Sequence, residues 1–201
     1  MTIDQTDLGT TIKEMESARQ AKLLPILAGP SSGRGAAMLD LAAHAPLVPG
    51  KVHVLLAFTG MTPHGTIGMD WLTGHLYQQL GEPPFADLTA LAGANLSDDL
   101  RMDGYETENG VVLAMKRDGY LAGSALALPG FHERVSSILE AERLIVGIPC
   151  PDDLLVTDAD GGCADELRSM TLDTDYDQGF LGPTVLLVDR TGMHVVADRQ
   201  I

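Results

Sequence analysis

Nearly continuous apolar runs predict two buried strands in this chain. Residues 51–58 read KVHVLLAF and residues 144–148 read LIVGI. Both runs are rich in β-branched and large aliphatic side chains, which suit the interior of a sheet. Pro149 and Pro151 follow the second run and limit it, because proline has no N–H to donate to a neighbouring strand. A further strand is expected at residues 153–157.

Two tetrapeptides rich in turn-forming residues predict β-hairpins. KRDG occupies residues 116–119 and DRTG occupies residues 189–192, and each ends in a glycine that can take a positive φ. Apolar runs flank both turns, which favours a strand on either side of each. The four expected strands cover residues 111–115, 120–128, 184–188 and 193–197.

Apolar residues at helical spacing predict helices in the rest of the chain. The first helix is expected to begin at Thr11, because Thr11 and Glu14 have the spacing of a capping box, and Pro25 limits it. Asp70 stands where it can cap another helix. The remaining expected helices cover residues 36–44, 70–80, 85–96, 131–141 and 163–170.

This order of elements predicts an α+β protein with a largely antiparallel sheet and helices packed on it. Only helices and loops are expected before the first apolar run. Residues 1–50 are therefore interpreted as a helical N-terminal annex and residues 51–201 as the α+β domain. A length of 201 residues suits one domain with a small annex.

The chain is strongly acidic, with 13 Lys and Arg against 28 Asp and Glu, a net charge of −15. Such a surface repels nucleic acids and anionic membranes, whose binding needs clustered basic side chains. The longest apolar runs are also much shorter than the ~20 residues of a membrane span. We therefore expect no nucleic-acid or membrane partner, and a protein partner that is basic or apolar. The chain could also form a homo-oligomer.

Acidic side chains gather in residues 150–178, which hold nine Asp and Glu and one Arg. The candidate binding residues in this stretch are Asp152, Asp153, Asp173, Asp175 and Asp177. Asp152 is expected to be exposed, and Asp153 to bond to nearby backbone N–H groups, because a carboxylate beside a core strand needs water or donors around it.

A second acidic group, Asp158, Asp160 and Asp165, is a candidate cation site. Asp158 and Asp160 have the i, i+2 spacing of calcium loops. Gly162 stands at the fifth position and Ser169 at the twelfth, where an EF-hand has a ligand and a Glu. The alternative, which we favour, is a strand-to-helix turn with acidic side chains at the start of the helix.

No motif of catalysis or cofactor binding stands out. The six histidines never have HxxxH spacing, and residues 29–35 are glycine-rich but are not followed by the Lys and Ser or Thr that a phosphate-binding loop has after its last glycine. Cys150 and Cys163 form no CxxC pair, and the first residues lack a signal-peptide pattern. We expect no catalytic residues, no cofactor and a cytoplasmic location.

Three motifs resemble those of the YtpQ-like family of uncharacterised bacterial proteins. FADLTALAGANL at residues 85–96 resembles the family's helix ending in Ala-x-Asn-Leu, and DGYLAGSALAL at residues 118–128 resembles its Gly-x-Tyr-x-Ala-Ser-x-Leu-Leu strand. LIVGIPCPDDLLV at residues 144–156 resembles its Val-Ala-Val-Pro-x-Arg-Asp-x-Leu-Leu segment and departs from it at Pro151-Asp152, where the family's Arg is missing. The resemblance covers residues 85–201 and implies a bacterial, soluble α+β protein. It implies no activity, because none is established for the family.

Together these features favour a non-catalytic protein-interaction module, such as an adaptor, a chaperone-like protein or an immunity-type binder. Two alternatives stay open. One is a metal-assisted hydrolase that uses the acidic residues between positions 152 and 165, and the other is a carrier of a small ligand in an apolar pocket. An enzyme would bring polar side chains together in one cleft, whereas a binding module would expose an extended apolar or acidic patch.

Overall fold

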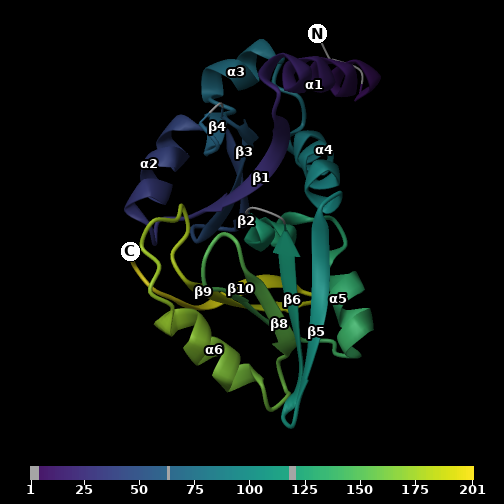
Figure 1. The fold of residues 1–201 in the computed structure, drawn as a ribbon, viewed down its shortest axis with the longest axis vertical. Coiled ribbons are helices and arrows are strands. Elements are labelled where there is room, and N and C mark those ends of the chain that lie inside the picture. The colour runs from purple at the N-terminus through teal and green to yellow at the C-terminus, as the bar shows by residue number, and fades with distance from the viewer. Residues whose placement is uncertain (1–4, 63, 118–120) are drawn as a thin grey trace.

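The computed structural model describes residues 5–62, 64–117 and 121–201, which fold into two β-sheets surrounded by helices (Figure 1). The strand pairs of both sheets are antiparallel. The predicted α+β class is therefore confirmed. Within the described residues, no helix has both the length and the apolar character that a membrane span requires.

Strand β3 (Val52–Met61) is the centre of the first sheet, as its apolar run predicts. β1 (Lys22–Ala28) pairs with one side of β3. β2 (His44–Val48) and β4 (Ile67–Trp71) share the other side, β2 along the first half of β3 and β4 along the second.

The first fifty residues do not form a helical annex, which corrects the prediction from sequence. They contain helices α1 (Gln5–Arg19) and α2 (Gly33–Leu41), but β1 and β2 also belong to them, and both strands pair with β3. The sheet is therefore continuous across residue 50. β1 reads KLLPILA, and six of its seven residues are buried. Burial of this apolar run in a sheet overrides the helical spacing that was expected to continue to Pro25.

Two predicted helix caps are also wrong. Thr11 lies inside α1, where its hydroxyl donates to the Asp7 carbonyl at 2.9 Å. Asp70 lies in β4, and α3 (Gly74–Gln79) begins after Thr73, whose hydroxyl accepts the Leu76 N–H at 3.3 Å. Thr73 therefore does the capping that was expected of Asp70.

The second sheet has six strands in the order β10-β9-β7-β8-β6-β5. These strands are β5 (Leu100–Thr107), β6 (Gly110–Arg117), β7 (Leu144–Ile148), β8 (Leu154–Asp158), β9 (Thr184–Asp189) and β10 (Gly192–Asp198). The strands predicted at residues 111–115, 144–148 and 153–157 and the C-terminal hairpin are confirmed.

The strand predicted at residues 120–128 is wrong. Ala122–Ala127 is a 3-10 helix, η1, which contacts β1, β6 and β8. β6 pairs instead with β5 and β8, so both of its edges are occupied. The small residues of η1 allow close packing, since a Cβ on Gly123 would lie 3.0 Å from the Pro151 carbonyl oxygen. Residues 118 and 119 of the predicted turn and residue 120 of the predicted strand lie outside the described residues.

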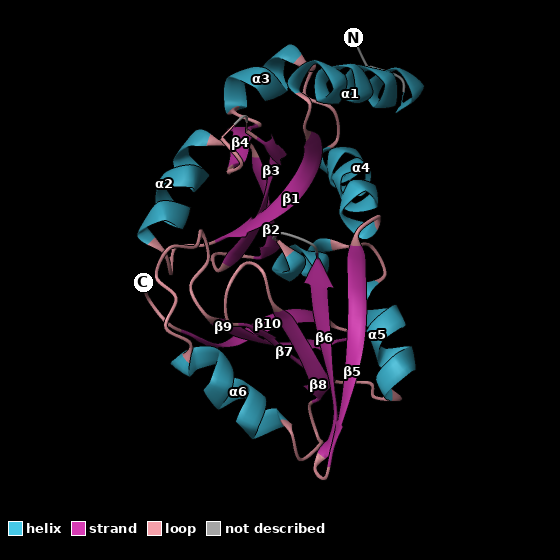
Figure 2. Ribbon diagram, viewed as in Figure 1, coloured by secondary structure: helices cyan, strands magenta, loops and turns pink. Residues whose placement is uncertain are grey.

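The remaining helices cover the two sheets, which share one core. α4 (Phe85–Ser97) packs on β1, α6 (Ala164–Asp173) packs on β7, and α5 (Phe131–Leu139) lies beside β5 (Figure 2). A single cluster of buried apolar side chains runs through both sheets. Its members include Leu24, Val54, Leu126, Val146 and Leu186.

Candidate functional site

Asp152 and Asp153 lie in the loop after β7, and each bonds to a different neighbour. Oδ1 of Asp152 accepts the Leu121 backbone N–H at 2.8 Å, and Oδ2 of Asp153 accepts the Cys150 thiol at 3.2 Å. Both residues are exposed. It is therefore Asp152, not Asp153 as expected, that bonds to a backbone N–H. Leu121 has a left-handed φ of 66°, which costs free energy in a residue with a side chain. The bond from Asp152 helps to hold Leu121 in this conformation at the start of η1.

The cysteine in this loop is not activated. Burial raises the pKa of the Cys150 thiol to about 11, and the neighbouring carboxylates of Asp153 and Asp152 contribute to the rise. The thiol is therefore protonated at neutral pH. Since the thiolate is the nucleophilic form, this cysteine is poorly suited to attack a substrate.

The three carboxylates of the predicted cation loop have separate partners. Asp158 accepts the Asp160 backbone N–H at 3.0 Å, Asp160 pairs with Arg143 at 2.9 Å, and Asp165 pairs with Arg168 at 2.8 Å. Within the described part of the chain, no three His, Cys, Asp or Glu residues are grouped so that they could hold a metal ion. The loop is a turn into α6.

Asp173, the last residue of α6, and Asp175 and Asp177 in the segment that follows it are exposed. The basic side chains around this segment bond to backbone carbonyls: Arg199 donates to Thr174 and Tyr176, and Arg34 donates to Gln178. The segment lies on the opposite side of the molecule from α5 and β5 (Figure 1). These carboxylates form an acidic surface that reaches the loop after β7, where burial and then the nearby charge of Asp152 raise the pKa of Tyr176.

An apolar groove lies between α5 and the strands β5 and β6, with a volume of about 520 Å³. Its floor is formed by the buried side chains of Met115, Leu128, Phe131 and Val135. At its rim, Met102 of β5 and Ile138 of α5 are 41% and 51% exposed. We call this hollow the α5–β5 groove. Its apolar rim is open to water.

β5 is the last strand of the second sheet, so one of its edges is unpaired within the described residues. It pairs with β6 over its whole length without a break in register. Seven of its eight residues are exposed, including Tyr105 at 46%. The backbone N–H and C=O groups along this edge face solvent, which is the arrangement that accepts an additional strand.

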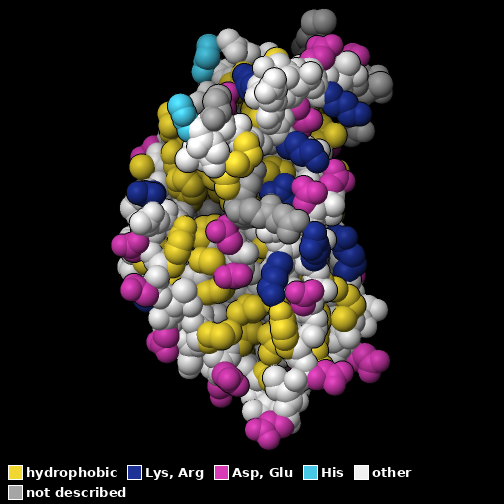
Figure 3. All heavy atoms as spheres, in the orientation of Figure 1, with side chains coloured by type: hydrophobic (Ala, Val, Ile, Leu, Met, Phe, Trp, Pro, Cys, Tyr) yellow, Lys and Arg dark blue, Asp and Glu magenta, His cyan; other side chains and the backbone are white. Residues whose placement is uncertain are grey.

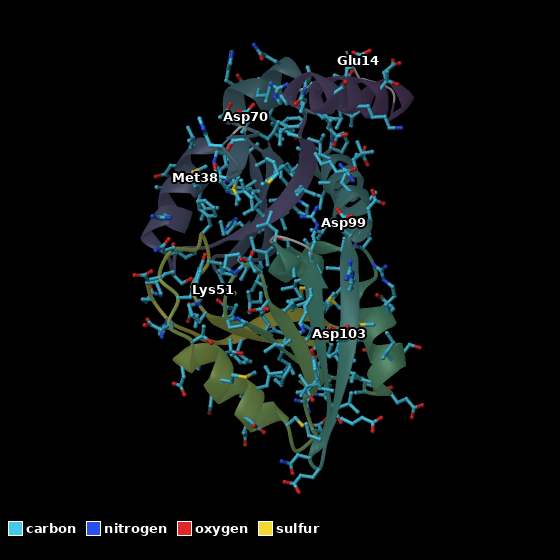
Figure 4. All side chains as sticks on the ribbon, in the orientation of Figure 1. Glu14, Met38, Lys51, Asp70, Asp99 and Asp103 are labelled. Atoms are coloured by element: carbon cyan, nitrogen blue, oxygen red, sulfur yellow. The ribbon has the colours of Figure 1, made fainter. Side chains whose placement is uncertain are left out.

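Charged side chains on the front face of β5 are paired with β6. The Lys116 ammonium donates to the Tyr105 hydroxyl at 2.7 Å and lies 3.4 Å from the Asp103 carboxylate, and these two contacts raise the pKa of Lys116. Asp99, which precedes β5, pairs with Arg117 at 3.3 Å (Figure 4). Figure 3 shows Lys and Arg side chains gathered beside hydrophobic ones over β5 and β6.

Three charged residues are among those that line the α5–β5 groove. Arg101 lines it from β5 and Arg134 lines it from α5, against the single acidic residue Glu133. A second hollow of about 740 Å³ lies on the other side of α5, against the turn between β9 and β10. It differs in chemistry, because charged side chains line it and Arg190 already pairs there with Glu142 at 3.0 Å.

Sequence reasoning missed β5, the strand on which this surface depends. Arg101, Asp103 and Glu106 make its sequence read as polar, and Gly104 interrupts the alternation. The signal that could have found it is Asn109–Gly110, because Asn-Gly between two runs favours a tight hairpin turn. β5 ends at Thr107, two residues before Asn109, and β6 begins at Gly110.

No family model, curated protein or solved structure matches this chain.

Proposed function

We propose that this chain is a non-catalytic protein-interaction module that binds an extended apolar segment of a partner protein along β5. The observation that carries the proposal is the combination of an unpaired, exposed strand edge with the α5–β5 groove beside it. A strand added to a sheet edge gains affinity from backbone hydrogen bonds and specificity from the pockets that take its side chains.

The edge of β5 lacks two of the features that prevent strand addition, proline and a bulge, while its charged residues Arg101, Asp103 and Glu106 are a third such feature. Sheets protect their edges with prolines, bulges or irregular pairing. β10, at the other end of the same sheet, has a break in register between Val195 and Ala197, and β2 contains Pro46 and a similar break. β5 has neither a proline nor a bulge.

The groove selects the side chains of the added strand. Successive side chains of a strand point to opposite faces of the sheet, so every second residue of the bound segment would face α5. There it would cover the exposed side chains of Met102 and Ile138. An apolar residue at these positions removes both from water, which favours binding.

The charge of the chain favours a partner that is basic outside the docking segment. A net charge of −15 attracts such a partner over a distance and speeds the encounter. The exposed carboxylates of Asp173, Asp175 and Asp177 contribute to this field. We place the module in the bacterial cytoplasm, in line with its two unpaired cysteines and its resemblance to the YtpQ-like family.

A peptide library tests the proposal. Random peptides are displayed with free C-termini and panned against the wild-type chain, and the recovered peptides are then measured against three variants. Met102→Lys and Ile138→Lys put a charge into the groove and should weaken binding by about tenfold or more. Val196→Lys is the matched control, because Val196 is 48% exposed on the opposite edge strand, and it should bind like wild type. Failure to recover any peptide, or an equal loss in all three variants, would contradict the proposal.

A further inference from the structure

We propose further that β5 pairs with β5 of a second copy of this chain, and that this contact competes with the partner for the strand edge. The inference rests on the proposed function, because it names what controls access to the same edge. It is carried by the order of side chains in β5, which is self-complementary about Met102.

The backbone groups on the open edge of β5 belong to every second residue. Thr107 and Gly110 close a two-residue turn, and the closing pair of such a turn exchanges hydrogen bonds. The odd-numbered residues of β5 therefore bond to β6. Leu100, Met102 and Gly104 direct their N–H and C=O groups to the open edge. An antiparallel copy of β5 can pair with these groups.

The symmetry of such a dimer limits how the two strands can be aligned. A two-fold axis brings residues equally distant from one central residue opposite each other. A centre at Arg101 or Asp103 would place that charged side chain opposite its own copy, and like charges directly opposite destabilise a strand pair. A centre at Gly104 would place Met102 opposite Glu106, an apolar side chain against a charge. Each of these registers is unfavourable.

A centre at Met102 avoids these conflicts. It places Arg101 of each copy opposite Asp103 of the other, so the contact contains two pairs of opposite charge. Arg101 borders the groove, but its side chain alternates with that of Met102 and lies with Asp103 on the other face of the sheet. The Asp103 carboxylate is 3.4 Å from the Lys116 ammonium, and its two oxygens have further acceptor sites. The charged residues that protect β5 from other strands thus select its own copy.

The same register covers the exposed apolar side chains at the groove. Met102, 41% exposed, lines the α5–β5 groove with Ile138, which is 51% exposed. With Met102 at the centre, the Met102 side chains of the two copies meet on the groove face, where Ile138 forms the other side of the rim. A centre at Tyr105 would leave Met102 outside the paired residues. Removing this apolar surface from water favours the register centred on Met102.

The size and charge of the chain make this dimer weak. Two copies that each carry a net charge of −15 repel each other, although Figure 3 shows Lys and Arg side chains gathered over β5 and β6, where the repulsion is smaller. The register pairs residues 100–104 of β5, fewer than the ~20–30 residues on each side of a stable interface. We expect a dissociation constant of about 100 µM. A dilute chain therefore keeps the edge open to the partner, and a concentrated one closes it.

Two opposite charge reversals test the inference by sedimentation equilibrium of the full chain. The mass of wild type should be close to that of one chain at about 10 µM and rise toward that of two chains at about 500 µM. Arg101→Asp and Asp103→Arg each place like charges opposite each other twice, and each should weaken self-association by about tenfold or more. An equimolar mixture of the two variants restores both pairs of opposite charge and should associate like wild type. Arg190→Asp, which changes the net charge by as much as Arg101→Asp but outside β5, is the matched control and should also associate like wild type.

Each result supports or overturns the inference. Wild type that keeps the mass of one chain at every concentration would overturn it, and so would self-association that persists unchanged in Arg101→Asp. Recovery of association in the mixture shows that both variants are folded, because a misfolded chain would not regain the contact. A mixture of variants with the circular dichroism of wild type that stays monomeric would overturn the inference.

These outcomes are separate from those of the proposed function, because none of the samples contains a peptide. A monomeric wild type that binds library peptides would overturn the inference alone, and a dimer that binds no peptide would contradict the proposed function alone. When both bind, an excess of a recovered peptide should return the dimer to one chain with one peptide. A dimer that persists with the peptide bound would show that the two do not compete and would overturn the inference.

Discussion

The exposed carboxylate of Asp152 has a structural role, because it bonds to the backbone of another segment. It accepts the backbone N–H of Leu121 at 2.8 Å, and Leu121 has a φ of 66°, a conformation that costs free energy in a residue with a side chain. The next carboxylate, Asp153, is also exposed and accepts the Cys150 thiol. Two adjacent residues of the same type therefore differ in what they stabilise.

Replacing Asp152 should reduce stability more than replacing Asp153. Asp152→Ala removes the acceptor of the Leu121 N–H and should lower the free energy of unfolding by about 1 kcal/mol. Asp153→Ala should have a smaller effect, because a thiol is a weak donor. Urea unfolding of both variants measures the difference. Equal losses in the two variants would show that the bond to Leu121 has no special role.

His53 makes the stability of the chain depend on pH. Its ring lies 5.0 Å from that of His44, and its Nδ1 is buried without a hydrogen-bond partner within the described structure. Burial, and then the proximity of His44, lowers the pKa of His53 below its ordinary value. Around the ordinary histidine pKa of about 6.5, the unfolded chain therefore binds more protons at this site than the folded chain does. The free energy of unfolding should decrease as the pH falls through this value.

A His53→Gln variant should lose part of this dependence. Urea unfolding is compared at about pH 7.5 and about pH 5.5, which bracket the ordinary histidine pKa. The decrease in unfolding free energy between the two should be smaller in His53→Gln than in wild type. His64→Gln, which replaces an exposed histidine, serves as the control. A decrease as large as that of wild type would assign the pH dependence to other groups.

The helices and strands that could be predicted are those with a clear pattern in their own sequence. β3 and β7 could be predicted because their apolar runs are continuous, and β9–β10 because Gly192 ends a turn between two such runs. β1 could not be predicted, because its apolar residues also fit the end of a helix that stops at Pro25. The 3-10 helix η1 could not be predicted, because its sequence AGSALA also fits a strand. What distinguishes the two is its packing against β1, β6 and β8, which the local sequence does not show.

The candidate site depends on information that the local sequence lacks. The α5–β5 groove exists because α5 lies beside a strand that precedes it by more than one element, and no local pattern reports that contact. The exposure of Asp173, Asp175 and Asp177 was predictable from a polar stretch. The partners of Asp152 and Asp160 were not, because Leu121 and Arg143 belong to other segments.

The contact between α6 and β7 depends on a glycine. A Cβ on Gly147 would lie 2.2 Å from Oγ1 of Thr171 and 2.7 Å from Cδ2 of Leu167, both on α6. Gly147→Ala should therefore force the helix away from the sheet and destabilise the chain by about 1–3 kcal/mol. Gly9→Ala is the control, because a Cβ at Gly9 of α1 meets no atom within 4 Å and alanine favours a helix. Thermal unfolding should rank Gly147→Ala below wild type and Gly9→Ala at or above it; the reverse order would refute this packing.

For the molecule as a whole, the C-terminal residues connect the two sheets. The Ile201 N–H donates to the Ser31 carbonyl at 2.7 Å, and the Gly33 N–H donates to the Ile201 carbonyl at 3.2 Å. β9 is an interior strand of the second sheet, and Val185 and Leu186 on it are fully buried. β9 therefore belongs to the shared core through Leu186, and the residues after β10 join it to the segment between β1 and β2.

Deleting residues 183–201 should abolish cooperative folding. The deletion removes β9 and β10 and exposes β7, whose residues are all buried in the intact chain. Circular dichroism during heating should show no sharp transition, and the truncated chain should aggregate. A shorter deletion of residues 199–201 leaves both strands and should keep a cooperative transition at a lower temperature. A truncation at residue 183 that melts as sharply as the full chain would contradict the shared core.

Hydrogen–deuterium exchange with a bound peptide tests the binding of a partner strand along β5 most directly. In the free chain, the amides on the open edge of β5 face water and should exchange fast. When a peptide recovered from the library is added, exchange should slow in β5 and in the first part of α5, because the peptide supplies hydrogen-bond acceptors and covers the groove. Residues 173–178 should exchange as before. Protection of residues 173–178 without protection of β5 would place the partner on the acidic surface instead and contradict the account.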